Sequence, residues 1–283
     1  MPVKIVECPR DAMQGFHSFI KTADKIAYIN QLLNVGFYAL DCGSFVSAKS
    51  VPHLADTASV LNNIDVPKNG TKLLVITANE RGASDACTFE NVSTLGFPFS
   101  ISEQFQIRNT KQNFQQASYT LAKINDLCHK SDKELLVYLS MGFGNPYGEP
   151  WSVELAFDWC AKLAELGVSQ INLSDTIGKA QPDDIAKLFN LCLINLPHVD
   201  FGAHFHTRPD NYLENIQAAY RSGCRKFDTA IKGFGGCPFA TDQLTGNLPT
   251  EDLLHYLDSI NESSSINNVA FAQAFNFASG IFI

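Results

Sequence analysis

Residues 200–206 read Asp200-Phe201-Gly202-Ala203-His204-Phe205-His206, and this stretch is typical of a buried strand that ends in two histidines. Successive side chains of a strand point to opposite faces, so both imidazoles leave on the same face. A helical pattern precedes the stretch over 183–196, another follows over 211–222, and the next apolar run spans 225–230. This part of the chain therefore has the order helix, strand, helix, strand.

The same alternation extends over the whole chain. Short apolar runs predict eight strands, at 3–6, 38–41, 72–76, 92–95, 135–140, 169–173, 199–204 and 225–230. Helical periodicity fills gaps between them, at 22–35, 113–129, 153–166, 183–196 and 211–222. Eight such units within 283 residues favour an α/β fold in which 1–283 form a single (β/α)8 TIM-barrel domain with an extra C-terminal helix.

The alternative is a doubly wound open sheet. Such a fold commonly carries a G-x-G-x-x-G motif after its first strand, and none is present there. Gly233-Phe234-Gly235-Gly236 follows the eighth predicted strand instead, where barrels often bind phosphate. The glycine pattern therefore favours the barrel.

Composition limits the classes of partner. Hydrophobic residues make up 45% of the chain and charged residues only 18%, so we expect a sizeable core. The net charge of −8 argues against a nucleic-acid or anionic-membrane surface. No signal peptide and no apolar run near 18 residues is visible, and the eight cysteines contain no C-x-x-C pair. We therefore expect a cytoplasmic protein with reduced thiols.

Polar residues that stand out follow the predicted strands. In a barrel the carboxyl ends of the strands form the active face, so these side chains are expected at one rim. They are Arg10, Asp11, Gln14, Asp41, Ser44, Asn145, Asp175, Thr176, His204, His206, Cys237 and Asn247.

Four of these residues form a candidate metal site. Asp11, His204, His206 and Asn247 offer one carboxylate, two imidazoles and one amide oxygen, a mixed set that suits Mg²⁺ or Mn²⁺ with open positions. Such an ion acidifies and orients a substrate hydroxyl. Each residue also has an ordinary interpretation: two plain strand histidines, a surface ion pair of Asp11 with Arg10, and a turn at Asn247.

Two further residues suit acid–base and electrostatic roles. Arg10 stays protonated and presents a planar fork of donors, so it could stabilise an enolate oxygen. Cys237 lies on a glycine-rich loop whose amides could lower its pKa, which makes it a candidate proton donor or acceptor. A structural thiol before Pro238 is the alternative.

The chain resembles the hydroxymethylglutaryl-CoA lyase family, within the DRE-TIM metallolyase group. The matching stretches are 4–7 with Pro9-Arg10-Asp11 and Gln14; Ser44-Phe45-Val46-Ser47 with Lys49; Asp175-Thr176-Ile177-Gly178; His204 and His206; Gly235-Gly236-Cys237-Pro238-Phe239-Ala240; and Gly246-Asn247-Leu248 with Thr250-Glu251-Asp252. They occur in the family's order, and the cysteine loop distinguishes the lyases from related synthases.

The resemblance implies cleavage of 3-hydroxy-3-methylglutaryl-CoA into acetyl-CoA and acetoacetate, as in leucine catabolism. It implies metal binding by Asp11, His204, His206 and Asn247, enolate stabilisation by Arg10 and acid–base work by Cys237, with His204 as a second candidate proton donor. We expect substrate contacts from Gln14, Asp41, Ser44, Lys49, Asn145, Asp175 and Thr176. Lys49 and Arg108 are candidate partners of the coenzyme phosphates, although both are also typical solvated charges.

The sequence departs from the family at several loops. Thr207-Arg208-Pro209-Asp210 follows the histidines where an acidic residue and a glycine turn are usual, Asn145 stands where a cysteine is expected, and Asp41 replaces a glutamate. These changes keep open another 3-hydroxyacyl-CoA substrate, or condensation of acetyl-CoA with a 2-oxo acid. A barrel that binds a metal or coenzyme A without catalysis is a further alternative. The apolar end Ile281-Phe282-Ile283 suggests a possible homodimer contact or internal packing.

Overall fold

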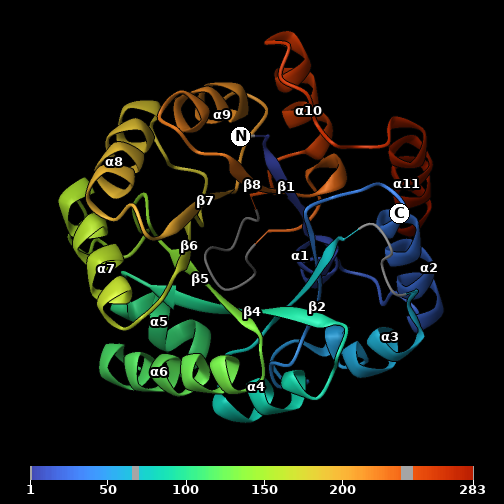
Figure 1. The fold of residues 1–283 in the computed structure, drawn as a ribbon, viewed down its shortest axis with the longest axis horizontal. Coiled ribbons are helices and arrows are strands. Elements are labelled where there is room, and N and C mark those ends of the chain that lie inside the picture. Colours follow the sequence, from blue (N-terminus) through green and yellow to red (C-terminus); the bar gives the residue numbers. More distant parts are fainter. Residues whose placement is uncertain (1, 66–69, 237–244, 283) are drawn as a thin grey trace.

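The computed structural model describes residues 2–65, 70–236 and 245–282, and their eight parallel strands close into a barrel (Figure 1). The strands follow one another around it in chain order, and β8 pairs with β1. The strands are β1 Lys4–Glu7, β2 Ala39–Ser44, β3 Lys72–Ile76, β4 Val92–Ser100, β5 Glu134–Ser140, β6 Gln170–Asp175, β7 Asp200–Phe205 and β8 Lys226–Thr229. The predicted (β/α)8 barrel is confirmed, and the open sheet is excluded.

Strand β4 extends five residues beyond its predicted end at residue 95. Gly96 and Pro98 interrupt the apolar pattern there, yet pairing with β5 continues from Thr94 to Ser100. Strand β3 ends opposite Gly96, so Pro98 pairs with β5 alone. A strand with one unpaired side tolerates proline, because the missing N–H costs no ladder bond on that side.

Helices surround the barrel, as Figure 1 shows. They are α1 Pro9–Gln14, α2 Thr22–Leu33, α3 Thr57–Asn63, α4 Glu80–Cys87, α5 Glu103–Thr110, α6 Phe114–Lys130, α7 Val153–Glu165, α8 Pro182–Asn195, α9 Tyr212–Arg221, α10 Thr250–Ser259 and α11 Asn268–Ile281, with 3-10 turns η1 Pro52–Leu54 and η2 Ile231–Gly233. The predicted extra C-terminal helix is α11, which lies beside α2. In the described part of the chain, no helix has the length and apolar character needed to cross a membrane.

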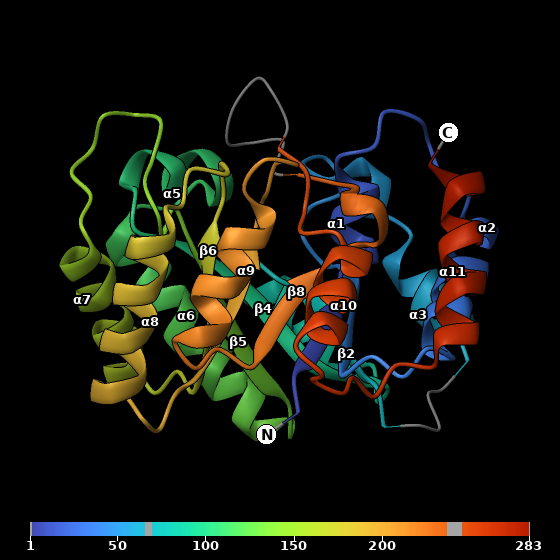
Figure 2. The same cartoon turned by 90° about the horizontal axis from the view of Figure 1, so that it is seen from above.

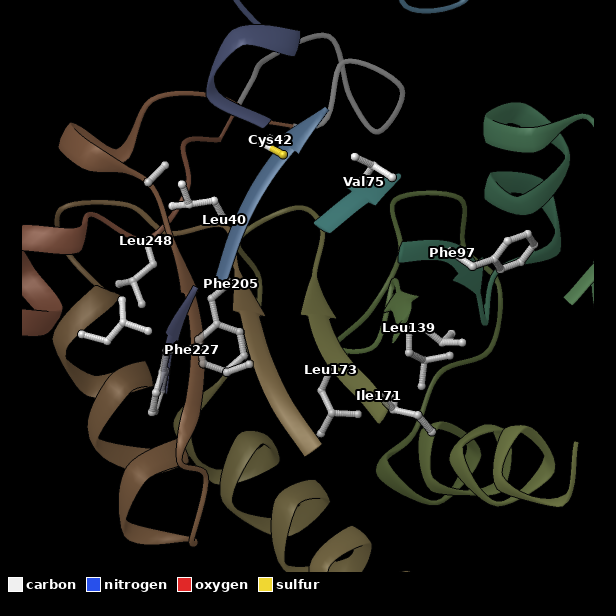
Figure 3. Close-up of a cluster of buried hydrophobic side chains, with 14 of the residues drawn as sticks. Leu40, Cys42, Val75, Phe97, Leu139, Ile171, Leu173, Phe205, Phe227 and Leu248 are labelled. Carbon is white, nitrogen blue, oxygen red and sulfur yellow. The ribbon is translucent and has the colours of Figure 1, made fainter. Parts of the chain in front are cut away.

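The hydrophobic core lies between the strands and the helices. Residues that alternate along the strands, such as Leu40, Val75, Phe97, Leu139 and Phe227, point outward into this layer (Figure 3). Side chains at the helix starts fix where two of the outer helices begin. Ser152 caps α7 by accepting from the Leu155 N–H, and Asn113 forms a capping box with Gln116 at α6.

The barrel interior is polar at its amino-terminal end. Lys4 and Lys226 both contact Asp200 at 3.2 Å, and Lys72 contacts Glu134 at 2.5 Å. Above this charged layer, a small apolar cluster of Leu74, Ile76, Leu136 and Tyr138 fills one side. These charged pairs fill the amino-terminal end of the interior, and the carboxyl ends of the strands are where a barrel places its active-site pocket.

Candidate metal centre and active site

A pocket opens at the carboxyl ends of the strands. The chain enters β1 from the N-terminus at the lower side of Figure 2, so the carboxyl ends of these parallel strands face the upper side. The pocket lining includes seven of the predicted residues, namely Arg10, Asp11, Gln14, Ser44, Thr176, His204 and His206. The structure thus brings these seven residues together around one pocket.

Three candidate metal ligands converge in this pocket. Asp11 lies in the short helix after β1, His204 lies in β7, and His206 directly follows β7. Their donor atoms lie within 4.8 Å of one another, and all three residues are buried. Residues separated by nearly 200 positions in the chain therefore form one potential ligand set, which is hard to explain as an ordinary surface ion pair.

Asn247 joins the same group through a contact across the barrel rim. It forms an antiparallel bridge with His206, and its Nδ2 donates to Asp11 Oδ2 at 2.7 Å and to the Phe234 carbonyl at 2.8 Å. In this orientation the amide is a donor, and rotation by 180° would present its oxygen at the same place. Asn247 is therefore positioned beside the carboxylate and both imidazoles.

His206 has a defined protonation state. Burial lowers the pKa of His206 to about 4, and the neighbouring His204 adds to this effect. Its Nδ1 lies 2.9 Å from the Thr245 carbonyl, which can only accept a hydrogen bond. Nδ1 must carry the proton, so Nε2 of the neutral ring keeps a free lone pair.

His204 is held by a carboxylate instead. Its Nδ1 lies 3.0 Å from Asp228 Oδ2. Burial acts to lower the pKa of His204, but the hydrogen bond and charge of Asp228 outweigh it and raise the pKa above its usual value. As for Asp11, burial would raise its pKa, but Arg10 and the two histidines hold it well below its usual range. The site therefore contains an ionised carboxylate beside two imidazoles.

This donor set fits a divalent cation. A carboxylate oxygen and two imidazole nitrogens whose other ring nitrogens are engaged are the usual arrangement of metal-ligating residues. The mixture of nitrogen and oxygen donors suits Mg²⁺, Mn²⁺ or a similar ion better than a closed thiolate site. The identity of the metal is a separate question from the presence of the site.

Arg10 lines the same pocket and contacts one of these ligands directly. Its Nη1 donates to Asp11 Oδ1 at 2.7 Å and to Gln14 Oε1 at 3.0 Å. Its Nε and Nη2 donate to Asp41 Oδ2 at 2.9 and 2.5 Å. Burial raises the pKa of Asp41 to about 6, although the charge of Arg10 opposes this. Asp41 therefore orients Arg10 in this structure.

Several residues expected to contact substrate have other partners. Asp175 accepts from the Lys179 and Ala180 amides at 3.0 and 2.8 Å, and Asn145 accepts from the Tyr147 and Glu149 amides at 3.0 and 3.1 Å. Both side chains thus shape their own loops. Asp41, Lys49, Asn145 and Asp175 do not line the pocket in the described structure. Substrate contact stays a prediction for these four residues.

The glycine loop approaches the ligands closely. A Cβ at Gly235 would lie 2.5 Å from Asn247 Nδ2 and 2.8 Å from the Asp11 carbonyl, and its φ of +105° also favours glycine. Gly235 therefore allows the loop to pack directly against Asp11 and Asn247. The predicted catalytic Cys237 lies outside the described residues.

Tyr138 is a pocket residue that the sequence analysis missed. Its ring packs edge-on against His204 with centroids 5.2 Å apart, and its buried hydroxyl has no hydrogen-bond partner among the described residues. The signal was present, because Tyr138 lies two residues before Ser140 on one face of a predicted strand. The sequence analysis also did not single out Asp228, which lies within a predicted strand.

The fold and these side chains define a (β/α)8 barrel with a candidate divalent-metal centre at the carboxyl ends of its strands. The family model described as HMGL-like matches residues 3–277, and the chain belongs to this family. The predicted family resemblance is confirmed.

Named relatives are similar over nearly their full lengths. A Bacillus subtilis protein named hydroxymethylglutaryl-CoA lyase YngG is 31% identical over 91% of this chain and 85% of its own length. Hydroxymethylglutaryl-CoA lyase of Pseudomonas mevalonii is 30% identical over 96% of this chain and 89% of its own.

Solved structures agree with these relatives. An HMG-CoA lyase structure from Brucella melitensis has a TM-score of 0.91 and 28% identity, covering 99% of each chain. An HMG-CoA lyase from Acinetobacter baumannii, in complex with coenzyme A and 3-methylmalate, has a TM-score of 0.92 and 29% identity, covering 99% of this chain and 91% of that one.

Proposed function

We propose that this chain is a metal-dependent lyase that cleaves 3-hydroxy-3-methylglutaryl-CoA into acetyl-CoA and acetoacetate. One observation carries the proposal: Asp11, His204 and His206 have donor atoms within 4.8 Å of one another in a pocket that also contains Arg10. The names of the relatives and the coenzyme A in a similar structure support the substrate class.

Asp11, His204, His206 and Asn247 would hold the metal. A bound divalent cation would acidify the substrate's tertiary hydroxyl and orient it next to a carbonyl oxygen. The protein's part is to keep both imidazoles unprotonated at the atoms that face Asp11. His206 achieves this through Thr245, since that carbonyl keeps the ring proton on Nδ1.

Arg10 would stabilise the charge that develops during cleavage. When the hydroxyl proton is removed, the C2–C3 bond breaks, the former hydroxyl carbon becomes the ketone of acetoacetate, and the electron pair passes into a thioester enolate. Arg10 is fixed by Asp41, Asp11 and Gln14 before substrate arrives, so its guanidinium needs little reorganisation. A fixed donor of this kind is typically worth about 10²–10³ in turnover.

A proton must then reach the enolate carbon to complete acetyl-CoA. We assign this acid–base role to Cys237, with His204 as the alternative donor. Tyr138 also lines the pocket, and we propose that its hydroxyl, which has no hydrogen-bond partner among the described residues, bonds to the substrate. Removal of a general acid usually lowers turnover by about 10²–10⁴, so Cys237→Ala should show a loss of this order while its metal affinity stays unchanged.

A related reaction is the second candidate. Asn145 and Glu149 organise the loop after β5, and Arg208 contacts Asp210 at 3.2 Å in the loop after His206, where the sequence departs from the family. These departures from the family keep open another 3-hydroxyacyl-CoA or a condensation of acetyl-CoA with a 2-oxo acid. A panel of thioesters and 2-oxo acids assayed with Mn²⁺ or Mg²⁺ would distinguish them.

The decisive experiment measures acetoacetate released from 3-hydroxy-3-methylglutaryl-CoA with Mn²⁺ or Mg²⁺, and again after chelation. We expect release that chelation abolishes and that His206→Ala reduces by at least about 10²-fold, since one ligand is lost. His198→Ala is the matched control, because His198 is exposed and precedes the same strand at the opposite end of the barrel. Release that is insensitive to chelation would contradict the proposal.

We propose a cytoplasmic enzyme of leucine catabolism. Leucine catabolism would follow from the reaction itself. The seven described cysteines are all free, which supports a reducing compartment such as the cytoplasm. A homodimer stays a prediction that sedimentation of the purified protein would test.

A further inference from the structure

Three buried polar side chains lie behind the candidate metal centre, on three neighbouring strands. They are Asn172 of β6, His204 of β7 and Asp228 of β8, with exposed fractions of 0, 8 and 2%. Asn172 Nδ2 donates to both carboxylate oxygens of Asp228 at 2.9 Å, and Asp228 Oδ2 lies 3.0 Å from His204 Nδ1. The contacts therefore run as a chain from the barrel interior to a proposed metal ligand.

The carboxylate of Asp228 determines which atoms donate and which accept in this series of hydrogen bonds. An ionised carboxylate only accepts hydrogen bonds, so a neutral His204 that bonds to it must carry its proton on Nδ1. The lone pair is then on Nε2, the ring nitrogen left to bind a cation. Without Asp228 the neutral ring could place its proton on either nitrogen, and the tautomer with Nε2–H cannot bind a cation through Nε2.

The neighbouring residues are arranged to keep Asp228 in this position. A Cβ at Gly202 would lie 2.3 Å from Asn172 Oδ1 and 2.6 Å from Lys226 Cε, so only glycine leaves room for the Asn172 amide. Asn172 Oδ1 has no hydrogen-bond partner among the described residues. The amide thus turns its donor to Asp228 although its own acceptor stays unpaired, which indicates that holding the carboxylate decides its orientation.

We propose that Asp228 is a positioning residue for His204, which fixes the Nδ1–H tautomer and the ring orientation, and that Asn172 orients Asp228. This inference rests on the metal centre of the proposed function but does not depend on the substrate. Hydrogen-bond partners of this kind are typically worth 10- to 100-fold in metal affinity. Asp228 touches neither substrate nor metal in this scheme.

The test compares Asp228→Ala and Asp228→Asn with the wild type by two measurements. The first is the Mn²⁺ dissociation constant, from the electron paramagnetic resonance signal of free Mn²⁺. The second is the tautomer of His204 in metal-free protein with ¹⁵N-labelled histidine, from the nitrogen chemical shifts at a pH where titration of the same signals shows the ring to be neutral. Neither measurement requires lyase activity.

We expect Asp228→Ala to raise the dissociation constant by about 10- to 100-fold and to mix the two tautomers of His204. Asp228→Asn should have a smaller effect, because its Oδ1 can still accept from His204 while its Nδ2 donates to the unpaired Asn172 Oδ1 after the Asn172 amide rotates. It also preserves the side-chain volume, so it serves if the alanine variant does not fold.

Asp200→Asn is the matched control. Asp200 is another carboxylate of the barrel interior, but it contacts Lys4 and Lys226 and not His204. Its dissociation constant should stay within about twofold of the wild type.

Unchanged Mn²⁺ affinity together with an unchanged tautomer in both Asp228 variants would overturn the inference and leave Asp228 a merely structural residue. Wild-type protein that binds no Mn²⁺ would instead overturn the metal centre. In that case the tautomer measurement would still decide whether Asp228 positions His204.

Discussion

Tyr138 shows how much a single side chain can indicate about a site. Its hydroxyl is buried and has no hydrogen-bond partner among the described residues, and the residue itself lines the pocket and packs against His204. A buried hydroxyl without a partner costs about 1–3 kcal/mol, so its retention suggests that it serves a ligand.

Tyr138→Phe should therefore leave the protein as stable as the wild type or stabilise it by up to about 1 kcal/mol, because an unsatisfied polar atom is removed. Turnover of the proposed substrate should fall by about 10-fold, since one hydrogen bond to a bound ligand is lost. Urea unfolding and steady-state kinetics would measure the two effects. A loss of stability with unchanged turnover would show that the hydroxyl is structural.

Asp41 gives a second prediction for a single residue. It accepts from two nitrogens of Arg10 and is completely buried. Breaking a buried pair typically costs about 3–5 kcal/mol, but Asp11 also contacts Arg10 and should retain part of this energy.

Asp41→Asn should thus lower the free energy of unfolding by about 2–3 kcal/mol and reduce turnover, because Arg10 loses its fixed orientation. Chemical denaturation with parallel kinetics would test both. The exposed pair of Arg208 with Asp210 offers a control, since Asp210→Asn should change stability by less than about 0.5 kcal/mol. Equal effects of the two substitutions would contradict the assigned role of Asp41.

At this scale the sequence predicted which residue types gather in the site, but not their hydrogen-bond partners. Asp11 and the two histidines were identified because their chemistry is unusual near strand ends. The contacts from Asp228 to His204 and from Asp41 to Arg10 depend on which strands lie side by side and on their register. Neither can be derived from the local pattern of one strand.

Among the elements, β1 is linked to the last strand and the segments after it by the side chain of one glutamate. Glu7 is fully buried and accepts from the Ile231 N–H at 2.7 Å, from Thr250 Oγ1 at 2.5 Å and from Thr229 Oγ1 at 3.4 Å. It therefore connects β1 with β8, with the turn η2 and with the start of α10. Burial raises the pKa of Glu7 to about 8, although the hydrogen bonds oppose this effect.

The sign of the resulting pH dependence follows from this shift. Between an unfolded value near 4.5 and a folded value of about 8, the unfolded chain loses the Glu7 proton while the folded chain keeps it. This group therefore lowers the free energy of unfolding as pH rises through that window, by at most about 1.4 kcal/mol per pH unit. Below the unfolded value its contribution is constant.

Glu7→Gln should remove this term while retaining an acceptor for Ile231. Relative to the wild type, the variant should become progressively more stable between about pH 5 and pH 8, by at least about 1 kcal/mol over the range. Urea unfolding of both proteins at several pH values would measure the difference. Parallel curves for the two proteins would show that Glu7 does not titrate in this window.

The strands and the long helices were predictable, but the shortest helices were not. Helices such as α6 and α8 have several turns of apolar periodicity, whereas α1 has six residues and α3 has seven, too few to show a pattern. In the sequence analysis α1 was treated only as polar residues after a strand. Its helical turn matters, because it presents Arg10 and Asp11 to the pocket.

For the whole molecule, the candidate metal centre brings together residues that follow the first strand and residues that follow the last strands of the barrel. Asn247 contacts Asp11 although 236 positions separate them, and the two histidines come from β7. The alternation of elements predicted the closed barrel, and closure is what brings β8 beside β1. An open sheet would have left Asp11 and Asn247 far apart, so here the fold and the site support the same interpretation.

A metal ion that binds residues after both the first and the last strands should stabilise the closed barrel against unfolding. A metal that binds the folded chain alone stabilises it by about 2.7 kcal/mol at 100 times its dissociation constant, which for a protein of this size corresponds to a rise in Tm of roughly 5 °C. Scanning calorimetry with Mn²⁺ and with chelator should show this difference in the wild type and in His198→Ala. It should be largely absent in His206→Ala. An equal rise in His206→Ala would place the stabilising metal elsewhere, because only a ligand lost from this centre can remove the effect.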